Sequence, residues 1–322
     1  MIPRSAAGAL RARLRGGTAP VRPPAEAPGG VAPTLAELVA LRGLAHARGR
    51  VPRGSSGLRA QAPSLLRGRG MEYAESRGYT AGDDARHIDW KLTARSGKPH
   101  TKLFQAERER LSLVLADTAP ALYFGTRARF KSTQAARAGA IAAWRAVADG
   151  DRVAVLRGSH REPPVPAAGG ARGALRVLDA LVRWYARPPG DDAGLEVGLD
   201  HAARLLRPGA RLLVLADPAS VAAVPAARWP AVAARHEVTV VLLTDPLEMA
   251  PPEAMLAFVA DGGGPQRRIE LDLSAPAQRA RWRAAFADRV AATAAELSAR
   301  GVRAVPLAAD APSDAWLATE RR

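Results

Sequence analysis

Three apolar runs that each end in an aspartate are the feature that most restricts the fold of this 322-residue chain. They extend from Leu111 to Asp117, from Ala210 to Asp217 and from Glu237 to Asp245. Continuous apolar runs of this length are typical of parallel strands that are buried on both faces. Segments of helical composition separate them, such as Lys131 to Ala148. Because strands that alternate with helices form parallel sheets with right-handed crossovers, we predict a doubly wound, mostly parallel α/β domain.

The same pattern continues through the rest of this domain, which we place at residues 108–322. We expect further strands at residues 151–156 and 302–308, one arm of a late hairpin at 269–273, and an edge strand at 162–165, where two prolines favour a sheet edge. We expect helices at residues 174–186, 195–206, 221–236 and 276–300. The helix at 174–186 should turn Leu175, Leu178 and Leu181 inward, and the one at 221–236 should continue through Pro225.

The part that precedes this domain divides into two segments. Residues 1–33 are rich in Pro, Gly, Ala and Arg without periodicity, which indicates a flexible basic tail. Residues 34–107 begin with a helix that Thr34 can cap. Its predicted apolar stripe consists of Leu35, Leu38, Val39, Leu41 and Leu44. We expect this helix to dock on the α/β domain.

A dense ionic stretch follows from Gly70 to Phe104. Neither helical nor strand periodicity is evident in it, and glycines interrupt it. Its aromatic residues indicate order, because disordered segments contain few aromatics. The charged and aromatic residues that we single out are Glu72, Arg77, Tyr79, Asp83, Asp84, Arg86, Asp89, Trp90 and Arg95.

We interpret this stretch as a loop that its own polar contacts hold in place. Asp83 and Asp84 can accept backbone N–H groups at a turn, and Arg77, Arg86 and Arg95 can donate to carboxylates. Trp90 should anchor the loop on an apolar surface. Because the stretch has too few apolar residues for a core of its own, we expect it to lie across the α/β domain, where it could either recognise a partner or stiffen the fold.

Charge is unevenly placed along the chain, whose net charge is +16. Residues 1–110 hold 20 basic against 9 acidic residues, so most of the excess lies in the first third. A basic segment suits an acidic partner such as nucleic acid, anionic lipid or an acidic protein face. The alternative is a compositional bias toward arginine, and it makes nucleic-acid binding the less favoured interpretation.

Other features of the sequence indicate the cellular compartment of the protein. It contains no cysteine, which excludes disulfides and thiolate chemistry and fits a reducing compartment. No apolar run is long enough to span a membrane, and no secretory signal is evident. We therefore expect a cytoplasmic, soluble protein.

The strand-end acids are the main candidates for a metal site. Asp117 and Asp217 would lie at the carboxyl ends of neighbouring strands, where doubly wound folds bind ligands. Mg²⁺ requires several oxygen ligands, but alanines occupy positions 119 and 121, where hydroxyls would help. Acids at strand ends also cap helices and bind arginine without a metal, and this structural role is our preferred interpretation.

No catalytic arrangement stands out. His87 lies among Asp83, Asp84 and Asp89, but no second histidine is near and the spacing matches no zinc pattern. There is no serine or cysteine nucleophile beside an ordered base, and Lys131 lacks the glycines of a phosphate loop. We expect no enzymatic activity and no resident cofactor.

The ionic stretch resembles the signature of the bacterial family called domain of unknown function 58. The likeness extends over residues 50–317. The signature positions that match are Gly70, Glu72, Tyr73, Arg77, Tyr79, Gly82, Asp83, Asp84, Arg86, Ile88, Asp89, Trp90, Thr93, Ala94, Arg95, Glu107 and Arg108.

The resemblance implies a fold similar to the von Willebrand factor A domain. In that group a metal-dependent adhesion site uses two aspartates, whose positions Asp117 and Asp217 match, together with hydroxyl residues. Ala119 and Ala121 stand where two serines belong, so the resemblance implies a degenerate site. It also implies a partner, because members are often encoded beside MoxR-type AAA+ ATPases.

Three functions follow as hypotheses. The first is a non-enzymatic adaptor or assembly factor that works with a MoxR-type AAA+ ATPase and an unknown client protein. The second is a nucleic-acid-binding protein that uses the basic first third. The third is a metal-dependent hydrolase that uses Asp83, Asp84 and Asp89 or the strand-end acids.

Overall fold

A six-stranded sheet is the centre of the computed structural model, which describes residues 30–47, 71–106, 110–260 and 267–321. Its order is β10-β7-β6-β3-β4-β5, and all neighbours are parallel except β4 and β5. The strands are β3 (Leu111–Ala116), β4 (Arg152–Arg157), β5 (Val165–Ala168), β6 (Arg211–Ala216), β7 (Glu237–Thr244) and β10 (Arg303–Ala308). The predicted mostly parallel α/β sheet is therefore confirmed, and the edge strand begins where the sequence predicted its end.

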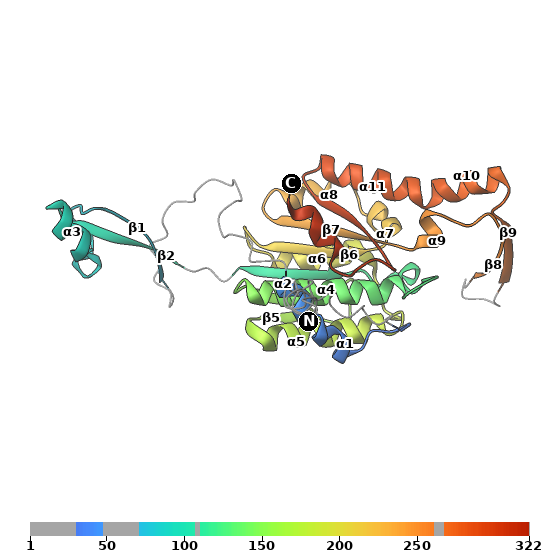
Figure 1. Cartoon of the computed structure of the whole chain (residues 1–322), viewed down its shortest axis with the longest axis horizontal. Coiled ribbons are helices and arrows are strands. Elements are labelled where there is room, and N and C mark those ends of the chain that lie inside the picture. Colours follow the sequence, from blue (N-terminus) through green and yellow to red (C-terminus); the bar gives the residue numbers. More distant parts are fainter. Residues whose placement is uncertain (1–29, 48–70, 107–109, 261–266, 322) are drawn as a thin grey trace, which may run out of the picture.

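Helices cover both faces of the sheet because successive strand residues point to opposite sides. Val114 of β3 belongs to the core under α4 and α5, whereas its neighbour Leu115 belongs to the core under α6, α7, α8 and α11. The ribbons of these helices lie on either side of the sheet (Figure 1). The helices are α4 (Lys131–Ala148), α5 (Gly170–Tyr185), α6 (Gly194–Leu205), α7 (Pro218–Ala223), α8 (Arg228–Ala233) and α11 (Ala287–Ala299). Two 3₁₀ helices follow strands of the sheet: η2 (Pro120–Leu122) comes after β3 and η3 (Ala315–Arg321) after β10.

The N-terminal helix docks on this domain, as predicted, but Leu35 and Val39 of the predicted stripe are 42% and 37% exposed. It consists of α1 (Leu35–Ala40) and α2 (Arg42–Ala47), and the Thr34 hydroxyl caps it by accepting the N–H of Glu37. Leu38 is buried against α4 and α5, and its carbonyl accepts the indole N–H of Trp144 at 3.2 Å.

The ionic stretch forms a compact unit that we name the signature module, residues 71–106. It consists of β1 (Met71–Gly78), η1 (Ala85–His87), α3 (Trp90–Ser96) and β2 (His100–Ala106), with β1 and β2 antiparallel. The sequence showed no strand periodicity here because the register shifts between Tyr73 and Glu75, which breaks the alternation of the two faces.

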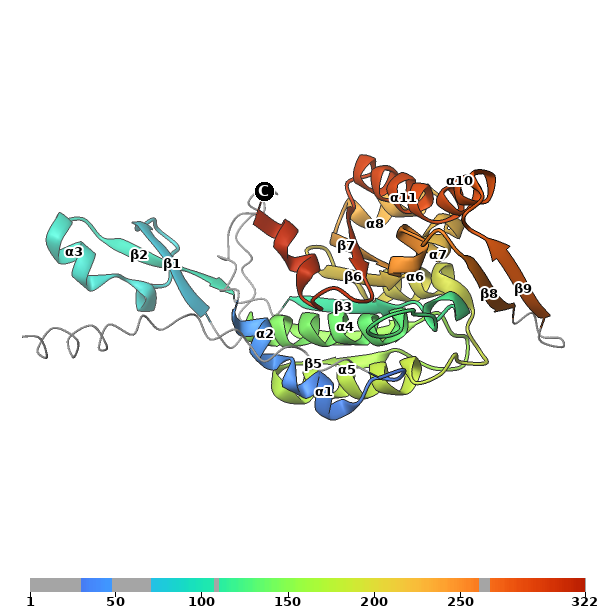
Figure 2. The same cartoon turned by 45° about the vertical axis from the view of Figure 1, so that its right-hand side comes forward.

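The signature module does not lie across the sheet, and this prediction is wrong. Its extensive contacts are internal, between β1 and β2, β2 and η1, and β2 and α3. Both views show it apart from the sheet, on the side where β3 begins (Figure 1, Figure 2). Trp90, the expected anchor, is 70% exposed. The chain geometry explains the position, because β2 ends at Ala106 and β3 starts at Leu111, so the module emerges at the amino ends of the strands.

Three helical details also differ from the sequence predictions. Pro225 separates α7 from α8, since its ring cannot continue a helix. The helix predicted over 276–300 is broken at Phe286, which has φ −120° and ψ −74°, into α10 (Pro276–Ala285) and α11. Leu175 is 41% exposed rather than inward, while Leu178 and Leu181 are buried as predicted.

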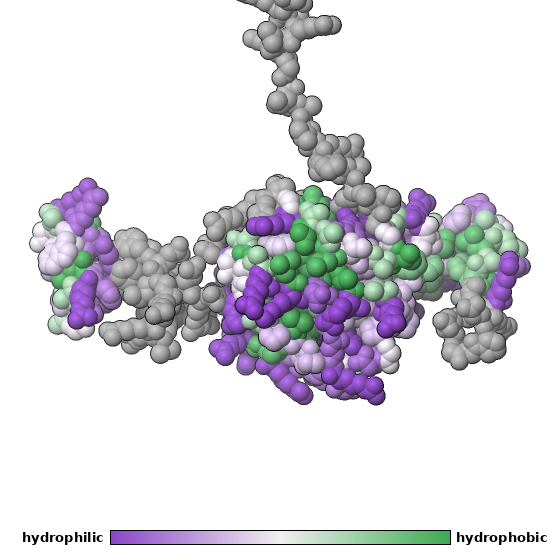
Figure 3. Space-filling view, turned by 90° about the horizontal axis from the view of Figure 1, so that it is seen from below, coloured by the Kyte–Doolittle hydropathy of each residue, from purple (hydrophilic) through white to green (hydrophobic). Residues whose placement is uncertain are grey.

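A second ribbon projects beyond the carboxyl ends of the strands (Figure 1). It pairs β8 (Met255–Ala260) with β9 (Arg267–Asp272), which confirms the predicted late hairpin, and follows the short helix α9 (Pro246–Met249). The ring of Phe258 packs on Trp282 of α10, with centroids 5.5 Å apart. Figure 3 shows apolar side chains gathered over this end of the molecule. None of the helices in the described parts of the chain is both long and apolar enough to cross a membrane.

Candidate functional site

The signature module is built around the turn that follows its first strand, β1. The Oδ2 of Asp83 accepts the backbone N–H of Thr80 at 2.9 Å, and its Oδ1 accepts Nη2 of Arg77 at 2.7 Å. The Tyr79 hydroxyl donates to the Asp83 carbonyl at 3.2 Å. The backbone hydrogen bond from Thr80, assisted by Arg77, lowers the pKa of Asp83 below its ordinary value. The turn is therefore self-braced, as the sequence predicted.

Two further aspartates of the module cap its short helices. Asp84 accepts the N–H of Arg86 at 3.0 Å at the start of η1. Asp89 accepts the N–H of Leu92 at 3.1 Å and the Ser76 hydroxyl at 2.9 Å, so it also ties α3 to β1. The hydrogen bond from Leu92 lowers the pKa of Asp89. The acids of the module thus support its backbone.

The cations and Trp90 of the module face outward. Arg86 and Arg95 are exposed and form no ion pair with any described side chain, so the predicted pairing of these two is not found. Glu72 lies in β1, but its side chain is outside the described residues, as are Gly70, Glu107 and Arg108 of the signature.

A second polar cluster lies at the carboxyl ends of the central strands; we name it the carboxyl-end rim and define it as Asp117, Lys131, Asp217, Asp245 and Glu248. Asp117 follows β3 and Asp217 follows β6, the neighbouring strands at which the strand order reverses. This is the place at which doubly wound sheets bind ligands. The two aspartates meet as expected, since the N–H of Asp217 donates to Oδ2 of Asp117 at 3.0 Å.

Asp117 is the most perturbed acid of the rim. It is 2% exposed, and its Oδ1 accepts the N–H of Ala119 at 3.0 Å. Burial raises its pKa to about 6, against the opposing hydrogen bonds from the Ser220 hydroxyl and backbone N–H groups. The nearby carboxylate of Asp192, which accepts the Thr118 hydroxyl at 2.8 Å, raises it further.

Lys131 supplies the positive charge of the rim from the first turn of α4. Its Nζ lies 2.8 Å from Oδ2 of Asp217 and 2.6 Å from Oε1 of Glu248, and the residue is 1% exposed. Burial alone would lower the pKa of Lys131, but the two carboxylates raise it above its ordinary value. The ammonium is therefore held charged between two acids.

The third strand-end acid, Asp245, is a helix cap. It accepts the N–H and hydroxyl of Thr126 and the N–H of Leu247, while Glu248 accepts the N–H of Asp245 at 2.9 Å in a capping box. Burial raises the pKa of Glu248, against the lowering effect of Lys131.

The rim does not fit the divalent cation that the family resemblance raised. Each carboxylate oxygen of Asp117, Asp217 and Asp245 already accepts a hydrogen bond from the protein, and Lys131 neutralises Asp217. A hard cation needs several free oxygen ligands. Within the described residues there is no group of three acids or histidines arranged to hold a metal.

Sequence reasoning missed Lys131 and Glu248. A weak signal existed, because a lysine in the first turn of a helix is unfavourable with the helix dipole, an effect that nearby carboxylates offset. The partners lie 86 and 117 residues further along the chain, so sequence spacing did not connect them.

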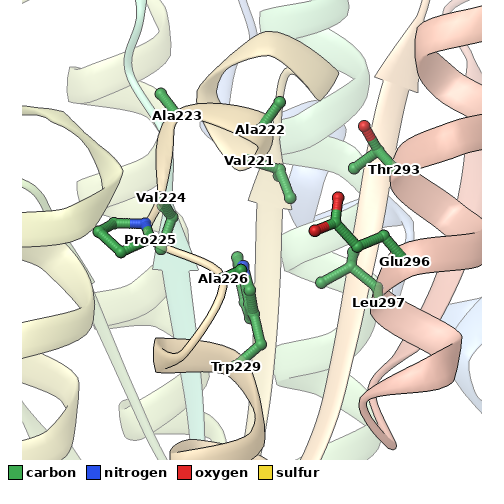
Figure 4. Close-up of a pocket in the computed structure, with 10 residues that line it drawn as sticks. All are labelled: Val221, Ala222, Ala223, Val224, Pro225, Ala226, Trp229, Thr293, Glu296 and Leu297. Atoms are coloured by element: carbon green, nitrogen blue, oxygen red, sulfur yellow. The ribbon is translucent and has the colours of Figure 1, made fainter.

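A shallow hollow of about 240 Å³ lies away from both clusters, between α7, α8 and α11. Most of the residues that line it have apolar side chains, among them Val224, Trp229 and Leu297 (Figure 4). The carboxylate among its lining residues, Glu296, forms an ion pair with Arg300 at 2.9 Å. The hollow therefore presents no reactive group.

Comparisons with known proteins agree with the signature. The chain is 29% identical over 235 residues to Uncharacterized protein Mb1516 of Mycobacterium bovis, a stretch that covers 71% of this chain and 73% of the relative. Uncharacterized protein Rv1480 of Mycobacterium tuberculosis is similar to the same extent. Residues 75–295 match the family described as "Protein of unknown function DUF58". Because this match spans more than half of the 322 residues, the chain belongs to the DUF58 family.

Proposed function

We propose that this protein is a non-enzymatic adaptor that binds other proteins through its signature module. The observation that carries the proposal is that one set of side chains stabilises the module while another is left exposed to solvent. Asp83, Asp84 and Asp89 stabilise its turns and helices, while Trp90 stands in solvent. A braced scaffold that exposes a tryptophan is a typical protein-recognition element, because tryptophan is enriched at binding hot spots.

The chemistry of both clusters supports binding over hydrolysis. A general base must be able to reach a substrate proton, and the acids that a hydrolase would use already accept hydrogen bonds from the backbone or from Lys131. The carboxyl-end rim is thus occupied in holding together the loops that follow the strands.

The partner that we propose for the module is a MoxR-type AAA+ ATPase, with a client protein bound elsewhere on the α/β domain. The family resemblance suggests this partner and a von Willebrand factor A-like fold, and the lack of cysteine in the sequence fits a cytoplasmic setting. The geometry supports two partners, because the module lies at the amino ends of the strands and the rim at their carboxyl ends (Figure 1).

Co-purification of the full chain with a purified MoxR-type ATPase tests the proposal. The experiment compares nucleotide-free, ADP-bound and ATP-bound ATPase. R77E should weaken the complex, because it reverses the charge that braces Asp83. The matched control is R281E, since Arg281 is exposed on α10. Absence of a complex in every nucleotide state would reject the ATPase as the partner, and equal binding by wild type and R77E would reject the module as the docking element.

A further inference from the structure

The part of the signature module between β1 and β2, residues 79–99, is named the tip here. Its acidic and basic side chains point in different directions, which its composition does not reveal. Its described acids turn toward the module's own N–H and hydroxyl donors. In contrast, four cationic side chains are exposed and form no ion pair with a described side chain; they are Arg86, Lys91, Arg95 and Lys98. The surface that a partner meets is therefore basic.

The outward face of α3 combines this charge with apolar area. Positions 90, 91, 94 and 95 are exposed and lie on neighbouring turns of one helix face, so Trp90 is beside Ala94 and Lys91 beside Arg95. The other face packs on β2, where the Thr93 hydroxyl accepts the N–H of His100 at 3.0 Å. α3 is thereby fixed with Trp90 70% exposed.

We infer that the face of α3 formed by Trp90, Lys91 and Arg95 binds an acidic protein surface, one that offers carboxylates around an apolar recess for the indole. Charge complementarity carries the inference. Guanidinium and ammonium groups pair with carboxylates, and a tryptophan surrounded by such pairs is the usual anatomy of a hot spot. The inference rests on the proposed function only in taking the module as the docking element, and it adds the chemistry of the partner.

A protein surface suits this face better than a nucleic acid. Single-stranded nucleic acids bind along a basic groove with several aromatic side chains on which successive bases stack. Here Trp90 is the aromatic residue that the tip exposes, since Tyr79 is half-buried and bonded to Asp83.

Two binding experiments with the full chain test the inference. The first measures affinity for a purified MoxR-type ATPase. The second measures affinity for a labelled peptide of alternating glutamate and leucine, for the same peptide with glutamine in place of glutamate, and for a 20-nucleotide single-stranded DNA. K91E/R95E should weaken binding of the acidic peptide at least ~10-fold and flatten its salt dependence. W90A should weaken it to a similar degree. K91R/R95K, which keeps both positive charges, and the control R281E should stay within about twofold.

The outcomes separate the inference from the proposed function. Peptide binding through Trp90 without ATPase binding would support the acidic-surface inference and reject the ATPase as partner. ATPase binding that K91E/R95E leaves unchanged would support the adaptor function and overturn the inference. Equal affinity for the glutamate and glutamine peptides, or tighter Trp90-dependent binding of the DNA, would also overturn it.

Discussion

Lys131 and Asp217 meet across the carboxyl ends of β3 and β6, with Nζ 2.8 Å from Oδ2 and the lysine 1% exposed. Glu248 contacts the same ammonium at 2.6 Å. The buried positive charge of the rim therefore comes from a side chain of the protein, and it joins α4 to the loops after β6 and β7. The rim therefore stabilises the fold, and its contribution to the free energy of unfolding can be measured.

Removing this charge should destabilise the fold strongly. K131M leaves two carboxylates buried without their cation, and such losses reduce the free energy of unfolding by about 3–5 kcal/mol. Urea denaturation of wild type and K131M measures the difference. Neutralising one acid as well, in K131M/E248Q, should restore part of the loss. K91M, at an exposed lysine, should change stability by less than about 0.5 kcal/mol. A loss in K131M no larger than in K91M would contradict the buried triad.

Asp117 should make stability fall as pH rises through the weakly acidic range. Its folded pKa of about 6 lies above its ordinary value of 3.8, so the folded state binds the proton more tightly. The resulting stability is fully present below about pH 4 and is lost as pH rises through about 6. The shift corresponds to roughly 3 kcal/mol for this buried group. The difference in unfolding free energy between wild type and D117N, measured from pH 4 to 8, should show this slope.

D272N is the control for that experiment. Hydrogen bonds from Ser274 lower the pKa of Asp272, which is the opposite shift. The stabilising effect of Asp272 is present above its ordinary pKa of 3.8 and is lost as pH falls below it. A flat difference curve for D117N between pH 4 and 8 would show that Asp117 ionises normally.

Gly158 should not tolerate a side chain. A Cβ at this position would lie 1.9 Å from the carbonyl oxygen of Gly194, so the backbone after β4 would have to move. We expect G158A to reduce the free energy of unfolding by about 3 kcal/mol, at the upper end of the effects of overpacking. At Gly190, in contrast, an added Cβ meets nothing within 4 Å, and G190A should be neutral to within about 0.5 kcal/mol. Thermal denaturation that gives equal effects for both variants would disprove the close approach.

The signature module should lose its local order without unfolding the sheet. D83A removes the acceptor of the Thr80 N–H and the partner of Arg77. Because the extensive contacts of the module are internal, the melting temperature of the α/β domain should stay unchanged. Hydrogen exchange should become faster in residues 76–90. Co-operative loss of the whole fold in D83A would indicate that the module and the sheet stabilise each other.

The sheet was predictable from the sequence because its determinants are local. The runs before Asp117, Asp217 and Asp245 are apolar at most positions, and each is followed by an aspartate that ends the strand. The same logic placed the three acids at one edge, since parallel strands share their carboxyl ends. The hydrogen bonds of Asp83 and Asp84 were also predictable from local sequence, because their partners lie two or three residues away.

What could not be predicted depends on contacts between distant segments. Lys131 acquires its role from acids far along the chain, and nothing near it in the sequence indicates them. The exposure of Trp90 was missed for a related reason. Its large aromatic side chain predicted burial. The module directly precedes β3 in the chain, however, and lies at the amino ends of the strands, where Trp90 is exposed.

The central claim, that the signature module is a docking element, is tested most directly by hydrogen–deuterium exchange of the full chain with and without a purified MoxR-type ATPase, under conditions in which the complex forms. We predict slower exchange in peptides that cover residues 80–98, with the carboxyl-end rim unaffected by this partner. Unchanged exchange over 80–98 in a formed complex, with protection at residues 117–131 and 245–248 instead, would contradict the claim.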